Sequence, residues 1–140
     1  MTPVSNIREL LKNMQPELVN EKYCFATIDE SQMMALTNYF SSIVCIYREK
    51  EGLTIVFSED VKEVMEHLSD AKIIGPFALI TLNVASDLLS VGLPARITEV
   101  LAREKIPVNA VSAYYHDHIF VPWERKDSAM AVLANLQKSS

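Results

Sequence analysis

The chain has few of the residues on which catalytic and metal-binding motifs depend. Its 140 residues include only three glycines and two cysteines. The sequence therefore offers no glycine-rich phosphate loop, and the long separation of Cys24 from Cys45 excludes a CxxC redox or zinc motif. A G-x-S-x-G elbow and an HExxH helix are absent as well. We expect no catalytic residues and no cofactor, and so a protein that is not an enzyme.

Basic charge and long apolar runs are also scarce. The chain has 13 Lys and Arg against 18 Asp and Glu, a net charge of −5, and the basic residues form no stripe of the kind that binds nucleic acid. The longest apolar run, near residues 77–85, is far shorter than the ~20 residues of a membrane span. The first residues show no signal-peptide pattern. We expect a cytoplasmic protein that binds neither nucleic acid nor membrane.

Apolar alternation and turn residues divide the chain into short strands and helices. The clearest strand covers residues 77–83, where both faces are apolar, as in a strand covered on both sides. The segment 29–42 has apolar residues without a regular period, and we expect a loop with one helical turn there. The remaining predicted elements are a helix near 7–14, strands at 23–28, 43–47 and 53–57, a helix after Ser58, a helix at 90–103, strands at 108–113 and 118–121, and a helix from about 124.

The two halves of the chain show a weak internal repeat. Each contains a hairpin followed by a helix, at 43–68 and at 108–137, which fits a ferredoxin-like βαββα(β) unit. Gly75-Pro76 interrupts the strand pattern between them. We therefore predict an N-terminal unit at 1–75 and a C-terminal unit at 76–140.

Each predicted unit lacks one element of the complete ferredoxin-like order. The first has no helix that matches the one at 90–103, and we expect this unit to be degenerate. The second has no strand after its final helix, so its sheet needs an edge strand from elsewhere. The sequence leaves two sources open: the strand at 23–28 and a partner chain.

The connection that follows the strand at 77–83 is the first candidate binding site. It is short and contains Ser86 and Asp87, which are typical helix-start residues. A short turn of this kind points backbone N–H groups at whatever lies above it, which suits a small anion or a carboxylate. The alternative is that Ser86 or Asp87 only caps the helix and that Gly92 only eases packing.

The tripeptide His116-Asp117-His118 is the second candidate. In a strand the two imidazoles lie on one face and the carboxylate on the other, so the histidines form half of a zinc site at most. No Cys, His, Asp or Glu cluster is spaced to supply the remaining ligands. We predict instead that the imidazoles hydrogen-bond to neighbouring strands or loops and that Asp117 serves the turn before its strand. No metal is expected.

Three segments of the chain resemble the ACT domain family. They are REKEGLTIVF at 48–57, ITLNVASDLLSVGL at 80–93 and AYYHDHIFVP at 113–122, in the order seen in short bacterial proteins made of tandem ACT-like domains. The resemblance covers the chain from Leu10 onward, and the double arrangement is similar to that of the animal cytosolic arginine sensors. It implies an α+β fold of two ferredoxin-like βαββαβ units packed side by side, the first degenerate.

ACT domains bind amino acids in regulated metabolic enzymes, so the resemblance implies a non-catalytic, allosteric sensor or regulatory protein. Its expected ligand is a small amino acid or a related metabolite. Its expected partners are a second copy of the chain, in a homodimer or larger homo-oligomer, and a regulated enzyme. The alternative is a structural or protein-interaction module that holds no ligand.

In ACT domains the turn after the first strand forms one wall of the amino-acid site. Carried onto this sequence, the resemblance makes the ligand-binding residues Ser86, Asp87, Ser90, Val91, Gly92 and Leu93. Asp87 is expected to accept the ligand's ammonium, Ser90 to add a hydroxyl, and Gly92 to allow close approach of the backbone. The SVGL-P sequence departs from the Pro-Gly pair of some ACT sites, which leaves the identity of the ligand open.

Overall fold

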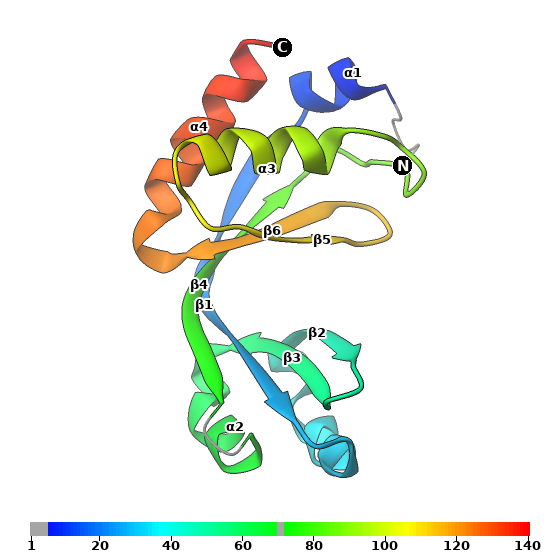
Figure 1. The fold of residues 1–140 in the computed structure, drawn as a ribbon, viewed down its shortest axis with the longest axis vertical. Coiled ribbons are helices and arrows are strands. Elements are labelled where there is room, and N and C mark those ends of the chain that lie inside the picture. Colours follow the sequence, from blue (N-terminus) through cyan, green and yellow to red (C-terminus); the bar gives the residue numbers. More distant parts are fainter. Residues whose placement is uncertain (1–5, 70–71) are drawn as a thin grey trace. The chain divides into compact units, whose positions relative to one another are not determined.

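The computed structural model describes residues 6–69 and 72–140 and alternates helices with strands (Figure 1). The elements are α1 (Ile7–Lys12), β1 (Pro16–Ile28), the 3-10 helix η1 (Glu30–Ser42), β2 (Ile43–Arg48), β3 (Leu53–Ser58), η2 (Glu59–Val61), α2 (Lys62–Leu68), β4 (Ile73–Leu82), α3 (Leu93–Arg103), β5 (Asn109–Ser112), β6 (Asp117–Pro122), η3 (Trp123–Arg125) and α4 (Lys126–Lys138). Within these residues, no helix has both the length and the apolar character that crossing a membrane requires.

The chain forms two compact units, one of which is inserted into the other. The inserted unit is Glu21–Phe77, and the discontinuous unit combines Met1–Asn20 with Ala78–Ser140. Strands β1 and β4 each begin in one unit and end in the other. In this grouping residues 6–20 belong with the C-terminal half, whereas the sequence analysis predicts a division at residue 75.

The inserted unit has the complete order strand, helix, strand, strand, helix, strand. Its strands follow the order β2-β3-β1-β4, and β1 pairs with β3 in antiparallel register from Tyr23 opposite Ser58 to Ile28 opposite Leu53. Alternate residues of the paired strands face one side, because side chains alternate along a strand. They build a core that is closed by η1 and α2 and consists of Cys24, Ala26, Ile28, Leu36, Leu53, Ile55, Phe57 and Met65.

The first helical position of the inserted unit is occupied by η1, where the sequence predicted a loop with one turn. That prediction is wrong in extent, since η1 runs from Glu30 to Ser42. A 3-10 helix has 3.0 residues per turn, so its buried residues do not follow the period of 3.6 by which an amphipathic α-helix is identified. The helix that the sequence analysis found missing from the first unit is therefore present, as a 3-10 helix in place of an α-helix.

The discontinuous unit obtains its edge strand from the start of β1. Its strand order is β1-β4-β6-β5, and the amides of Asn83 and Val84 donate to the carbonyls of Gln15 and Met14 at 3.4 and 3.3 Å. From the sequence, either residues 23–28 or a partner chain could supply this edge strand. The edge strand is instead the start of β1, which precedes residues 23–28. The sequence did not predict a strand there because Glu17 and Asn20 interrupt the apolar alternation.

Helix α1 joins α3 and α4 over the core of the discontinuous unit. The side chain of Asn6 caps α1 by accepting hydrogen bonds from the amides of Arg8 and Glu9. Leu10 and Met14 are completely buried and belong to one cluster with β4, α3 and α4. The cluster also contains Leu11, Ala78, Ile80, Leu82, Val84, Leu93, Ile97, Leu101, Ile106, Ile119, Val121, Ala129, Leu133 and Leu136.

The placement of α1 leads to a prediction about local stability. Leu10→Ala should destabilise the protein by about 2–5 kcal/mol, because it leaves a cavity in the core beside α3 and α4. Hydrogen exchange should become faster at the amides of β6, more than a hundred residues along the chain. The matched control is Leu36→Ala, which should act first on the inserted unit. Faster exchange in Glu21–Phe77 with β6 still protected in Leu10→Ala would contradict the assignment of α1.

Candidate functional site

The loop between β4 and α3 is tied to the β5–β6 hairpin through Ser86. This residue is buried; its amide donates to the carbonyl of Tyr115 at 3.2 Å. Its hydroxyl donates to Oδ2 of Asp117 at 3.1 Å. Two of the three segments that resemble ACT domains, 80–93 and 113–122, therefore meet at one point.

The carboxylate of Asp117 lies at the centre of this contact. Asp117 is the first residue of β6 and is only 7% exposed. Its Oδ1 accepts a second hydrogen bond from the hydroxyl of Ser112 at 2.6 Å. Among the residues described, no Lys, Arg or His forms an ion pair with it. The carboxylate is thus buried against neutral donors, which leaves its charge available to a cation.

A small cavity opens beside Asp117, with a volume of about 30 Å³. Its lining residues are Ser86, Asp87, Leu88, Ser90, Pro94, Ser112 and Asp117. About 10–15 Å³ of space measured in this way holds one water molecule, so the cavity has room for one or two water-sized groups. An ammonium group, which is about the size of a water molecule, fits such a space.

Asp87 and Ser90 form a closed turn within the loop. Oδ1 of Asp87 accepts from the amide of Leu89 at 2.8 Å, and the carbonyl of Asp87 accepts from the amide and the hydroxyl of Ser90 at 2.9 and 2.7 Å. This side-chain turn corrects the sequence interpretation, in which Ser86 or Asp87 starts the following helix. Both residues make their hydrogen bonds before α3 begins.

Helix α3 starts at Leu93 rather than at Ser90, and Gly92 is its N-cap. Gly92 has a φ of 109°, which an L-residue with a side chain adopts only under strain. A Cβ at this position would lie 3.4 Å from Cδ1 of Ile7, an ordinary contact, so glycine is needed here for its backbone angle rather than for space. The same turn sets the direction of α3.

The N-terminus of α3 adjoins the cavity, since Pro94 in its first turn is one of the lining residues. The amides of Gly92, Leu93 and Ala95 have no acceptor within residues 6–69 and 72–140. Unpaired amides at a helix start carry partial positive charge and attract anions. The cavity therefore has a buried carboxylate on one side and a helix N-terminus close by.

The structure brings only part of the predicted binding set to the cavity. Ser86, Asp87 and Ser90 line it. Val91 points into solvent, and Leu93 is fully buried in the hydrophobic core, so only its backbone can face a ligand. Two further lining residues, Ser112 and Asp117, were missed as site residues, although Asp117 was recognised as a residue of the turn. Whether any of these residues binds a ligand remains a prediction.

The two histidines beside Asp117 hydrogen-bond to the chain around β4. Nδ1 of His116 lies 3.2 Å from the carbonyl oxygen of Val84, and Nδ1 of His118 lies 3.0 Å from Oγ1 of Thr81. Their rings are 6.4 Å apart. In the part of the chain that the structure describes, no three His, Cys, Asp or Glu side chains are grouped as metal ligands. Both histidines thus make hydrogen bonds to neighbouring strands or loops, as the sequence analysis predicts.

Large apolar side chains are exposed on the loop and on the hairpin that carry residues of the cavity lining. Leu88, Leu89 and Val91 of the loop are exposed, Leu89 at 88%, as are Tyr114 and Tyr115 of the hairpin. The two tyrosine rings stack edge to face with centroids 4.9 Å apart. We call these five residues the apolar rim. Such exposure around a polar cavity is typical of surfaces that contact a ligand or another protein.

Comparison with known proteins identifies the family. Residues 2–65 and residues 76–135 each match the ACT domain family. The chain therefore belongs to this family and carries two ACT domains in tandem, as the resemblance implied, and the predicted α+β fold of two ferredoxin-like units is confirmed. A search among curated proteins found no match.

Solved structures share the arrangement. A protein of unknown function from Vibrio cholerae is 37% identical, with a TM-score of 0.75 over 93% of this chain and 94% of the other. The ligand-free regulatory subunit of aspartate kinase from Thermus thermophilus has a TM-score of 0.67 at 11% identity, over 89% and 98% of the two chains. Aspartate kinase from Clostridium acetobutylicum has a TM-score of 0.69 at 9% identity, over 88% of this chain and 34% of that enzyme. The two aspartate kinase similarities show the fold alone.

The environment of His118 predicts a dependence of stability on pH. Burial lowers the pKa of His118 below its ordinary value of 6.5, the nearby His116 adds to this, and Asp117 opposes it. Below about pH 6.5 the unfolded chain therefore binds more protons than the folded one, so the free energy of unfolding falls as the pH drops.

We expect His118→Gln to flatten this dependence as the pH falls below the ordinary histidine pKa of about 6.5, since it removes the titrating group. Chemical denaturation at several pH values measures the effect, with the exposed His67→Gln as a control. An NMR titration in which His118 protonates at or above its ordinary pKa would contradict the prediction.

Proposed function

We propose that the protein is a non-catalytic regulatory protein that binds a small amino acid, or a related metabolite, at the cavity beside Asp117. One observation carries this proposal: a buried carboxylate without a cationic partner faces a cavity of ammonium size next to the free amides of a helix N-terminus. An α-amino acid carries both complementary charges on one carbon. The proposal pairs its ammonium with Asp117 and its carboxylate with the amides at the start of α3.

The size of the cavity limits how such a ligand enters. In this proposal the ammonium enters the cavity of about 30 Å³, and the α-carbon and side chain of the ligand lie outward, toward the exposed residues of the apolar rim. Asp87 stands at the same edge, and its carboxylate already accepts from the amide of Leu89. In this proposal Asp117 is therefore the principal acceptor and Asp87 the secondary one.

The regulatory part of the proposal concerns partners. ACT domains are typically regulatory modules, and the solved relatives include a regulatory subunit of aspartate kinase. We propose that this protein acts on a regulated enzyme in the cytoplasm and works as a homodimer. Leu89, Val91 and Tyr114 support a dimer, because a partner chain would cover their exposed surface. Light scattering at ~100 μM that gives the 15.8 kDa mass of a monomer would count against it.

The rival proposal is an interaction module without a ligand. It has the same fold and the same exposed rim, and in it Asp117 only holds the loop and the hairpin together through Ser86 and Ser112. The two proposals differ in one measurable respect. Ligand that binds the folded state alone raises its stability, by about 2.7 kcal/mol at ~100 times the dissociation constant.

A melting screen against the twenty amino acids tests the proposal. Wild type should be stabilised by one or a few of them at millimolar concentration. Asp117→Asn should abolish the response, and Asp87→Ala and Gly92→Val should weaken or abolish it, the last through backbone strain at the start of α3. The matched control is Asp60→Asn, which removes one exposed carboxylate in the inserted unit and should leave the response intact.

The outcomes separate the alternatives. If no amino acid stabilises wild type, the amino-acid sensor fails and the interaction module takes its place. If Asp117→Asn responds as wild type does, a site exists but lies elsewhere in the molecule.

A further inference from the structure

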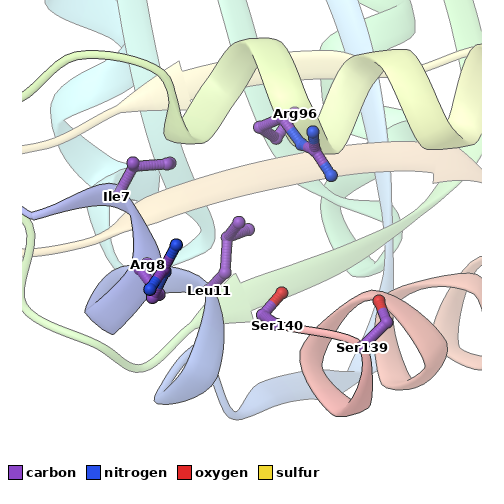
Figure 2. A pocket seen from close by; sticks show the side chains of 6 residues that line it. All are labelled: Ile7, Arg8, Leu11, Arg96, Ser139 and Ser140. Atoms are coloured by element: carbon purple, nitrogen blue, oxygen red, sulfur yellow. The ribbon is translucent and has the colours of Figure 1, made fainter.

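A second, larger pocket lies among the helices of the discontinuous unit, where Ile7 also adjoins Gly92 of the loop described above. It has a volume of about 660 Å³ and is lined by Ile7, Arg8, Leu11, Arg96, Ser139 and Ser140. Figure 2 shows Arg8 on α1 and Arg96 on α3, with the two serines at the end of α4. We call this space the helix pocket. Its volume is within the range of about 300–1,000 Å³ that is usual for small-molecule sites.

The two arginines are held by well-anchored helices. Leu10 and Leu11 fix α1 in the core, and Leu93, Ile97 and Leu101 fix α3. Arg8 and Arg96 are exposed residues of these same helices. Residues on helices are positioned more precisely than residues on loops, so the pocket presents two guanidinium groups from a defined frame.

The guanidinium groups of Arg8 and Arg96 are unpaired, which distinguishes them from the other arginines of the chain. Arg48 pairs with Glu30, Arg103 pairs with Glu99, and Arg125 donates to the carbonyls of Lys105 and Glu104 at 3.3 and 3.2 Å. Within residues 6–69 and 72–140, neither Arg8 nor Arg96 has a carboxylate or carbonyl partner for its side chain.

The local charge of the helix pocket is opposite to that of the whole protein. The chain carries a net charge of −5. Glu99, three residues after Arg96 on α3, is engaged by Arg103. No Asp or Glu side chain is among the residues that line the pocket. Two guanidinium groups without a carboxylate partner favour the binding of an anion in this pocket and disfavour the binding of a cation.

We propose that the helix pocket binds a small organic anion with two oxyanion groups, carboxylate or phosphate, one for each arginine. The planar guanidinium fork matches both kinds of oxyanion through two parallel hydrogen bonds. Ile7 and Leu11 provide an apolar wall for the carbon chain between the charged groups, and the hydroxyls of Ser139 and Ser140 lie at its edge. None of its lining residues lines the amino-acid cavity, and it gives the protein a second class of effector.

Isothermal titration at constant ionic strength tests the proposal with two probes, glutarate for a dicarboxylate and inorganic pyrophosphate for a phosphate. At least one should bind to wild type with a dissociation constant of about 1 mM or lower, and the tighter one identifies the source. Arg8→Gln and Arg96→Gln should each weaken binding about tenfold or more, since each removes a charge-assisted pair. Arg96→Lys keeps the charge but not the fork and should show an intermediate loss.

Two controls make the result decisive. Lys50→Gln makes the same change in net charge in the inserted unit and should leave the affinity unchanged. Asp117→Asn, which should remove the amino-acid response, should retain anion binding. The proposal is overturned if neither probe binds at ~10 mM, if Lys50→Gln weakens binding as much as Arg96→Gln, or if Asp117→Asn abolishes it.

Discussion

The carboxylate of Asp117 joins the three chain segments from which the candidate site is made. One oxygen accepts from Ser86 in the loop after β4, and the other accepts from Ser112 at the end of β5. Hydrogen bonds to a charged group contribute about 1.5–3 kcal/mol each, so these two contacts hold the loop and the hairpin in place around the cavity. The charge that organises the site is also the group best suited to bind an ammonium.

The frame around this carboxylate depends on the continuity of β1. Because the start of β1 supplies the edge strand, the discontinuous unit is complete within one chain. The discontinuous unit therefore needs no edge strand from a partner chain. The feature that favours a dimer is instead the exposed apolar rim. The same strand connects α1 to the sheet, which places Arg8 across the helix pocket from Arg96.

Local sequence predicted those elements whose side chains follow a regular period. The apolar run at 77–83 became β4, and the spacing of Ile97 and Leu101 marked the buried side of α3. The polar start of β1 and the 3-10 geometry of η1 have no such period, so they were missed. In the candidate site, Ser86 and Asp87 are neighbours in sequence, and the sequence predicted both as site residues. Asp117 lies 31 residues from Ser86 and joins it only through the fold.

An NMR titration of the uniformly ¹⁵N-labelled protein with the twenty amino acids tests the central claim most directly, because it locates binding without relying on a mutation. The account predicts amide shifts concentrated at residues 86–95 and 112–118, with the largest at Asp117 and at the start of α3. Shifts confined to Glu21–Phe77, or spectra that no amino acid changes, would contradict it.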